Sequence, residues 1–359
     1  MIIERRKICL KNDFITESGF RLVTPEVAYE AYGTPGKPAI LVTHGGLQDH
    51  RIAGNPAPED LMPRHWDSLI GPNKVINTNH FWVISANFLG SMFGTCGPTS
   101  INPQTGKPYQ GSFPTITLTD TVRFHKLFLE ELGVNELELM IGPSTGGLQT
   151  LEMAALYPKF VKKAVAIAAA PKMPPEGIAV HLAVMNTITA DPAFNNGFYD
   201  PQKTLPAMKI VAQFLKIYFI QHRILKKLIW NNFPNDATAH SQRIAAIQSF
   251  LTAGIEEQLK DRDPNSYLRI LEAVNSFDLA KHANNYEAGV QRITCPLLII
   301  NIETDTEFPP FWADEAAEII HKIRPGQVSV AHIDSDWGHL GCLKETQKIT
   351  QLLNDFLAK

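Results

Sequence analysis

The sequence is poor in cysteine, in net charge and in long hydrophobic runs, and each shortage argues against a class of protein. Its four cysteines are widely scattered and form no CxxC pair, which argues against a disulfide framework and against a zinc site: Cys9, Cys96, Cys295 and Cys342. The formal net charge of -3 and the lack of a long basic block argue against nucleic acid as a partner. No apolar run approaches the length that spans a bilayer, so we expect no membrane segment.

The beginning of the chain and its overall composition fit a globular protein. The stretch MIIERRKICLKNDF carries charge but no sustained apolar segment, so it does not resemble a secretory signal. With cysteines expected to be reduced and structural, we predict a cytoplasmic protein without a bound metal. A hydrophobic fraction of 44% and a length of 359 residues allow one large domain with an insertion, or two smaller domains.

Apolar runs alternate with helical patterns over much of the chain. Strand-like runs occur at residues 39–43, 81–87, 137–141, 164–169, 297–301 and 328–333. Helical patterns separate several of them, at residues 121–132 and 149–156 for example. Continuous apolar strands between helices predict an α/β fold, with a mostly parallel central sheet covered on both faces.

This alternation stops after Pro171 and returns near Arg292. The intervening residues have mostly helical patterns, which predicts a core domain made of residues 1–171 and 292–359 and a helical lid insertion at residues 172–291. Such an insertion can lie over the carboxyl edge of the sheet. The long loop at residues 90–114 carries enough aromatic and apolar residues for us to expect it to be ordered.

The stretch LMIGPSTGGLQTLEMAALYPK places Ser144 between an apolar strand and a helix. It matches the Gly-x-Ser-x-Gly pattern of a nucleophile elbow, in which glycines allow the backbone to pass close to a strained serine. The alternative is a structural turn, but the strand–turn–helix context favours a nucleophile.

A serine nucleophile needs a base and an acid that orients this base, and in this fold they follow the serine in the order acid, then histidine. Asp305 comes directly after the strand-like run 297–301, and the nearby Glu303 and Glu307 are competitors that we interpret as solvated loop charges. His339 follows Gly338 in a loop after the last strand, whereas His332 lies within that strand. We therefore predict Asp305 as the acid and His339 as the base.

The transition state also needs donors for its oxyanion. We expect one to be the backbone N–H of Thr145, the residue after the nucleophile. The second should come from the loop THGGLQDH after the early strand, at Gly46 or Leu47.

Longer motifs resemble those of the homoserine O-acetyltransferase family of the α/β-hydrolase fold. The stretch NFLGSMFGTCGPTSINPQTGKPYQGSFPTITLTDTVR, residues 87–123, is similar to a long segment of that family and is far more specific than the elbow. GPSTGGLQTLEMAALYP, DPAFNNGFY and TDTEFPP resemble three further segments, so that the resemblance covers most of the chain.

The resemblance implies transfer of an acyl group from acyl-CoA to a hydroxyl amino acid through an acyl-serine. By position it matches Ser144 to the nucleophile, Asp305 to the acid and His339 to the base. It also implies a homodimer joined through the lid helices, with small-molecule substrates. Acyl-CoA would be a co-substrate and no cofactor would stay bound; no phosphate-binding loop in the sequence points to CoA independently.

The sequence departs from the family at the acceptor site. The family has a carboxylate directly after the catalytic histidine, where this chain has Leu340, and an arginine six residues before the Asp-Pro pair, where it has Met185. Because an unpaired charge in a closed pocket costs several kcal/mol, losing both partners argues against homoserine. Tyr199 lies in a family-like segment and is a further candidate pocket residue.

Three hypotheses follow. The first is an acyltransferase using acyl-CoA, with acetyl-CoA as the expected donor and an acceptor less charged than homoserine. The second is a serine esterase of the same fold with water as the acceptor, which shares the acyl-enzyme. The third, a binding protein without catalysis, is disfavoured by the intact Ser, Asp and His set.

Overall fold

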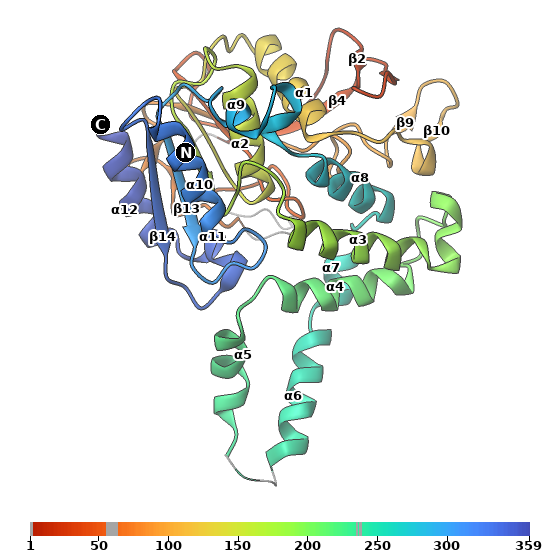
Figure 1. The fold of residues 1–359 in the computed structure, drawn as a ribbon. Helices are drawn as coiled ribbons and strands as arrows, with labels where there is room; N and C mark the ends of the chain where they lie inside the picture. Colours follow the sequence, from red (N-terminus) through yellow and green to blue (C-terminus); the bar gives the residue numbers. More distant parts are fainter. Residues whose placement is uncertain (1–2, 55–63, 235, 237–238) are drawn as a thin grey trace.

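The computed structural model describes residues 3–54, 64–234, 236 and 239–359. Its centre is an eight-stranded sheet in the order β1-β4-β8-β5-β11-β12-β13-β14. The six strands from β8 to β14 run parallel, and the antiparallel β4 and β1 extend one edge. The fold class predicted from the sequence is therefore confirmed (Figure 1).

The strands of the central sheet are β1 (Ile3–Cys9), β4 (Glu26–Tyr32), β5 (Ala39–Val42), β8 (Trp82–Ala86), β11 (Leu139–Pro143), β12 (Ala164–Ile167), β13 (Leu297–Ile302) and β14 (Val328–Ile333). Short pairs add β2 (Phe14–Ile15), β3 (Arg21–Leu22), β6 (Ile70–Gly71), β7 (Ile76–Asn77), β9 (Ile101–Asn102) and β10 (Lys107–Pro108). Each of the predicted runs overlaps a strand, with ends that differ by at most two residues. The β9–β10 pair lies in the long loop that we expected to be ordered.

The helices are α1 (Leu118–Glu131), α2 (Thr145–Leu156), α3 (Pro175–Thr189), α4 (Pro206–Tyr218), α5 (His222–Leu228), α6 (His240–Thr252), α7 (Ile255–Leu259), α8 (Pro264–Asn275), α9 (Tyr286–Val290), α10 (Phe311–His321), α11 (Gly341–Lys344) and α12 (Thr346–Leu357). Among the described residues, no helix combines the length and apolar character needed to cross a bilayer.

Alternation along the strands divides the core between the two faces of the sheet. In β5, Ala39 and Leu41 join a cluster with α1, α2 and α10, whereas Ile40 and Val42 join a cluster with α12 on the other face. Successive side chains of a strand point to opposite faces, so a continuously apolar strand is needed when helices cover both.

The two antiparallel strands at the edge were not predicted. β1 reads IERRKIC and carries alternating charge because it is an edge strand, where charged side chains prevent further pairing. Its Arg5 donates to the buried Glu30 of β4, with 2.6 Å between Nε and Oε1. A strand with this composition lacks the apolar signal used for the other strands.

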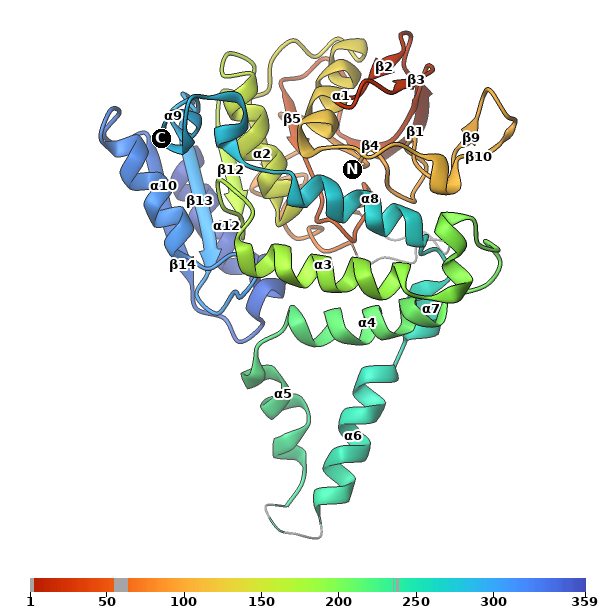
Figure 2. The same cartoon turned by 45° about the vertical axis from the view of Figure 1, so that its right-hand side comes forward.

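The segment 172–291 is helical, and part of it forms a layer over one end of the sheet. α3 and α4 run across the carboxyl ends of the strands, and α5 and α6 project away from the body (Figure 2). α3 and α4 share an apolar cluster with α7 and part of α8. However, Ile270 and Val274 of α8 and Val290 of α9 belong to the core cluster. Core packing therefore extends into the predicted lid segment, whose bounds stay a prediction.

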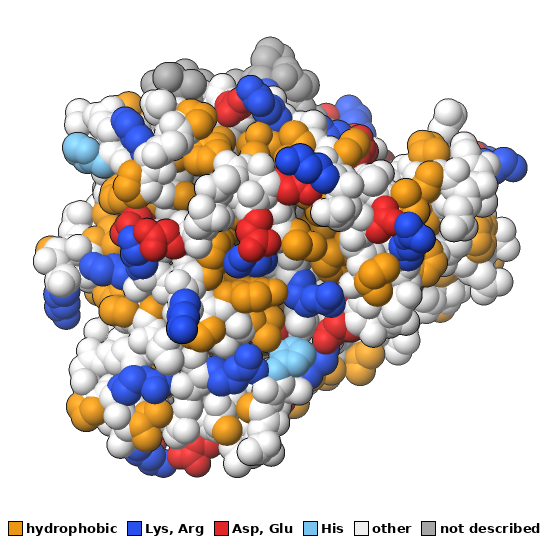
Figure 3. Space-filling model, turned by 90° about the horizontal axis from the view of Figure 1, so that it is seen from above, with side chains coloured by type: hydrophobic (Ala, Val, Ile, Leu, Met, Phe, Trp, Pro, Cys, Tyr) orange, Lys and Arg blue, Asp and Glu red, His pale blue; other side chains and the backbone are white. Residues whose placement is uncertain are grey.

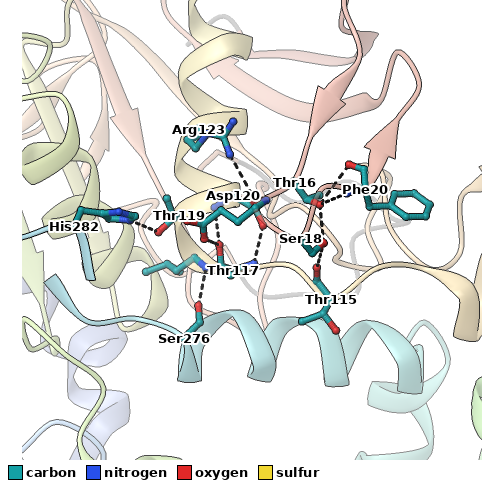
Figure 4. Close-up of polar contacts among 12 residues, drawn as sticks. Thr16, Ser18, Phe20, Thr115, Thr117, Thr119, Asp120, Arg123, Ser276 and His282 are labelled. Atoms are coloured by element: carbon teal, nitrogen blue, oxygen red, sulfur yellow. Dashed lines mark hydrogen bonds and ion pairs between the residues drawn. The ribbon is translucent and has the colours of Figure 1, made fainter. Parts of the chain in front are cut away.

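A polar network at the start of α1 ties α8 to the core (Figure 4). The side chain of Thr117 accepts from the N–H of Asp120, and the side chain of Asp120 accepts from the N–H of Thr117, forming a capping box. The N–H of Leu118 donates to the Ser276 hydroxyl, just beyond α8, at 3.1 Å. α8 is thereby fixed to the core at the end nearest α1.

Candidate active site

Ser144 occupies the turn between β11 and α2 with φ 56° and ψ -126°, a conformation that is strained for any residue with a side chain. The two glycines of the motif cannot be replaced by larger residues without movement. A Cβ on Gly142 would lie 2.4 Å from the Thr43 hydroxyl oxygen, and one on Gly146 would lie 2.3 Å from the Thr43 carbonyl oxygen. The strand, turn and helix predicted from the sequence are all present.

The structure brings Ser144, His339 and Asp305 into one chain of hydrogen bonds. Nε2 of His339 lies 2.8 Å from Oγ of Ser144, and Nδ1 lies 2.8 Å from Oδ2 of Asp305. With a neutral imidazole, Nδ1–H donates to the carboxylate and Nε2 accepts from the serine hydroxyl. In this arrangement a base can take the serine proton while an acid fixes the ring.

The three residues meet because parallel strands end at a common edge. Ser144 follows β11, Asp305 follows β13, and His339 lies in a 3₁₀ turn after β14. Asp305 is anchored by its own turn, since Oδ1 accepts the backbone N–H groups of Glu307 at 2.8 Å and Phe308 at 3.1 Å. The carboxylate is therefore held in place for the imidazole.

Burial and charge act in opposite directions on His339. Burial alone would lower the pKa of the imidazole, but the charge and hydrogen bond of Asp305 and the charge of Glu307 outweigh it, so that the pKa of His339 is raised. These carboxylates stabilise the imidazolium form, which is the form that a general base reaches after accepting the serine proton.

Glu307 is not the solvated loop charge that we predicted. Its side chain is buried, 3% exposed, and Oε1 lies 3.0 Å from Nε2 of His181 on α3. Burial alone would raise the pKa of Glu307, but the hydrogen bond and charge of His181 outweigh it and keep the carboxyl ionised. Nothing in the local sequence indicates this pair, because its members lie on segments far apart in the chain. Glu303 is exposed, as expected.

His332 lies on β14, as predicted, and not at the site. Its Nε2 lies 3.0 Å from Oδ1 of Asp314 on α10, on a partly exposed part of the sheet edge. His339 is thus the histidine that reaches the serine.

Donors for an oxyanion are grouped beside Ser144. Thr145 is the first residue of α2, so its N–H has no carbonyl in a preceding turn to donate to. Gly46 and Leu47 line the same cavity as Ser144, and a Cβ on Gly46 would lie 2.9 Å from the Thr145 hydroxyl oxygen. The carbonyl of Leu47 accepts from Arg262 at 2.7 Å, which steadies the loop. Both loop amides stay candidates.

A cavity of about 460 Å³ opens at Ser144 and His339, beneath the lid helices. Leu340 lines it, as expected from the departure in sequence. Met185 and Tyr199, the other two predicted pocket residues, are not among the residues that line it. The Tyr199 hydroxyl instead donates to Asp263, and Met185 packs against the apolar cluster of the lid. Packing within the lid directs both side chains away from the cavity. Position in the sequence alone does not reveal this packing.

No group of three or more His, Cys, Asp or Glu in the described part of the chain is arranged to hold a metal ion. All four cysteines are free, and only Cys9 is exposed.

On the face opposite the lid, basic and acidic side chains are interspersed (Figure 3).

Known proteins are similar to this chain over most of its length. A family model described as alpha/beta hydrolase fold matches residues 38–346. The homoserine O-acetyltransferase of Moorella thermoacetica is 35% identical over 95% of this chain and 92% of its own length. The homoserine O-succinyltransferase of Hahella chejuensis is 31% identical over 96% of this chain and 91% of its own length.

Solved structures superpose over the whole chain. Esterase E22 has a TM-score of 0.89 and 28% identity, covering 99% of this chain and 100% of its own. The homoserine O-acetyltransferase of Bacillus anthracis has a TM-score of 0.90 and 22% identity, covering 100% and 98%, and at that identity it supports the fold alone.

Proposed function

The chain belongs to the homoserine O-acetyltransferase family of the α/β-hydrolase fold, and on that premise we propose that it transfers an acyl group from acyl-CoA to a hydroxyl acceptor other than homoserine. We take acetyl-CoA as the donor. The observation that carries the choice of acceptor is Leu340, which lines the cavity directly after His339. Ser144 is the proposed nucleophile, His339 the base and Asp305 the acid.

In the first half of the proposed reaction, Oγ of Ser144 attacks the thioester carbonyl while Nε2 of His339 takes the serine proton. The N–H of Thr145 and an N–H of Gly46 or Leu47 stabilise the oxyanion. The tetrahedral intermediate then collapses, the C–S bond breaks, and His339 returns the proton to the departing CoA thiolate. The product is acyl-Ser144 and free CoA.

In the second half, His339 takes the proton of the acceptor hydroxyl, and the acceptor oxygen attacks the acyl-serine. Collapse of the second intermediate releases the new ester and returns the proton to Ser144. CoA acts as a substrate throughout. A CoA thioester as donor also supports the cytoplasmic location expected from the sequence.

The side chain of Leu340 supports an acceptor without an ammonium group at this position. The side chain is apolar, and the rings of Phe219 and Phe308 lie 5.2 and 5.7 Å from the imidazole, centroid to centroid. A charge placed here without a partner would cost several kcal/mol. Met185 does not line the cavity and so carries no weight in this argument.

A serine esterase is the second candidate, and the similarity to esterase E22 at 28% identity over both chains favours it. Hydrolysis would use the same acyl-Ser144, with water in place of the acceptor. The two candidates differ only in what deacylates the enzyme.

Intact-protein mass separates the two candidates. The protein is mixed with acetyl-CoA and, separately, with a simple acetate ester, with Ser144→Ala as the control. An acetyl adduct that forms from the thioester and is discharged by an alcohol supports the transferase. An adduct that forms only from the ester and is lost to water at the same rate with and without alcohol supports the esterase. No adduct from either compound would refute both.

We further propose a homodimer joined through the lid helices. On α4, Ile210, Phe214 and Ile217 recur at helical spacing and are 59%, 42% and 42% exposed. A stripe of exposed apolar side chains of this kind marks an interaction site more often than a solvated face. Light scattering during size-exclusion chromatography tests it: Phe214→Glu should give a monomer, whereas a dimer unaffected by this change would contradict the lid interface.

A further inference from the structure

The cavity is larger than the small groups suggested by the family would need. A volume of about 460 Å³ is within the range of roughly 300–1,000 Å³ typical of sites for drug-sized ligands. An acetyl group and a four-carbon amino acid together are well below that size. Part of this space would hold the pantetheine arm of acyl-CoA in the first half of the proposed reaction, and the chemistry of the walls indicates what the alcohol half requires.

The proposed reaction shows which wall faces the alcohol. His339 exchanges a proton with the alcohol oxygen, so this oxygen must lie within hydrogen-bond reach of Nε2. The carbon chain behind the oxygen then runs along the side chains next to His339. Phe219, whose ring lies 5.2 Å from the imidazole, and Leu340, the next residue in the chain, are two of them, and the backbone N–H of Leu340 donates to the Phe219 carbonyl at 3.3 Å.

This wall continues as a row of aliphatic side chains. Beyond Phe219, the cavity is lined by Leu215 of α4 and by Ile224 and Leu228 of α5. Leu215 is 8% exposed and Ile224 6% exposed, whereas Leu228 is 48% exposed at the outer end of the row. These side chains therefore form an apolar wall that runs outward from His339 along one side of the cavity.

Three of the four Lys, Arg and Glu side chains that line the cavity make hydrogen bonds or an ion pair within the protein. Nζ of Lys216 donates to the carbonyls of Phe250 at 2.5 Å and Ala253 at 3.0 Å. Arg262 donates to the Leu47 carbonyl, and Glu307 is paired with His181. Lys344 is exposed, and its Nζ lies 5.5 Å from the centre of the Trp337 ring. The side chains of Phe219, Leu215 and Ile224 themselves carry no donor or acceptor, so a polar group lying along them would lose hydrogen bonds to water without replacement.

We propose that the alcohol half of the substrate is an apolar alcohol with a medium-length alkyl chain, held along Phe219, Leu215 and Ile224. The inference rests on the proposed function, and it applies equally to an acceptor in transfer and to a leaving group in hydrolysis. Each methylene moved from water into an apolar site favours binding about fourfold, so a longer chain gains until the wall ends.

A series of acetate esters tests the proposal with the intact enzyme. We expect kcat/KM to rise from ethyl through butyl and hexyl to octyl acetate, by at least tenfold in total. Ethyl octanoate is an isomer of octyl acetate that carries its long chain on the acyl side, so differences in overall hydrophobicity cancel. Octyl acetate should be preferred to it by at least tenfold.

A matched pair of variants locates the preference on the wall. Ile224→Trp narrows the channel and should reduce the preference for octyl over ethyl acetate at least tenfold. Ile323→Trp makes the same exchange at a residue that is 47% exposed and outside the cavity, and should keep the preference. If Ile224→Trp does not fold, the comparison of the two isomers in the natural enzyme still decides.

The possible outcomes distinguish a failure of this inference from a failure of the proposed function on which it rests. Turnover of octyl acetate no faster than that of ethyl acetate, or slower than that of ethyl octanoate, overturns the inference while acetyl-Ser144 still forms. No acetyl-enzyme from any ester or from acetyl-CoA overturns the proposed function and the inference with it.

Discussion

Glu152 offers a prediction whose size can be derived from the structure. The residue lies on α2, is 2% exposed, and accepts the Thr119 hydroxyl at 2.6 Å. Nε2 of His282 lies 3.7 Å from the same carboxyl oxygen, and also 3.1 Å from the Thr119 hydroxyl, a contact shown in Figure 4. Burial is the largest effect and raises the pKa of Glu152 from 4.5 to about 7, against the hydrogen bond of Thr119 and the charge of Lys281.

The raised pKa fixes the sign of the pH dependence. The folded protein keeps the Glu152 proton to higher pH than the unfolded chain, so the free energy of unfolding falls as pH rises from 4.5 to about 7. The gap between these two pKa values, at about 1.4 kcal/mol per pH unit, amounts to about 3 kcal/mol. The free energy of unfolding falls by this full amount only at pH values above the pKa of Glu152 in the folded protein.

Glu152→Gln removes the ionisation and keeps an oxygen that can accept the Thr119 hydroxyl. We expect the variant to be more stable than the natural protein by up to about 3 kcal/mol near pH 8.5, and by less than about 1 kcal/mol near pH 4.5. Urea unfolding followed by tryptophan fluorescence measures both values.

The control is Glu318→Gln, at an exposed glutamate of α10, which should change stability little at either pH. A Glu152→Gln variant whose stability difference from the natural protein is the same at both pH values would refute the reasoning. So would a loss of stability at the higher pH.

Three further predictions concern the site. Ser144→Ala and His339→Ala should each lower ester turnover by roughly 10⁴-fold or more while circular dichroism stays unchanged, and a loss below tenfold would remove them from the mechanism. Glu307→Gln should move the acid limb of the kcat/KM profile to lower pH, because it removes one charge that raises the pKa of His339; an unchanged midpoint would contradict this. Leu340→Asp should increase acetylation of homoserine in a coupled CoA-release assay, and no gain would place the specificity elsewhere.

Much of the fold could be predicted because its signals are local. Each parallel strand is an apolar run within one segment, and Ser144 is identified by its immediate neighbours in a strand–turn–helix context. Asp305 and His339 could be predicted from their places after β13 and β14, since parallel strands end at one edge. The charged edge strand β1 was missed because its stability comes from pairing with β4, a partner that the pattern does not contain.

The missed parts of the site depend on contacts between distant segments. Glu307 was interpreted as solvated because acidic loop residues are usually exposed, and only its contact with His181 across the lid explains its burial. Met185 and Tyr199 were placed in the pocket by sequence position, yet their side chains pack within the lid. Side-chain direction at such positions is set by tertiary packing, which one sequence does not reveal.

The turn after β13, which carries Asp305 and Glu307, explains how this fold can accept a different alcohol and still keep its catalytic residues in place. Asp305 and Glu307 leave the same turn two residues apart, and the backbone N–H of Glu307 holds the carboxylate of Asp305. One carboxylate orients His339, while the other binds His181 and so joins the lid to the core. The residues that would contact the alcohol, Phe219 and Leu340, make no hydrogen bond to either carboxylate through their apolar side chains. Substitution along that wall can therefore alter which alcohol is accepted while the hydrogen bonds of Ser144, His339 and Asp305 stay intact.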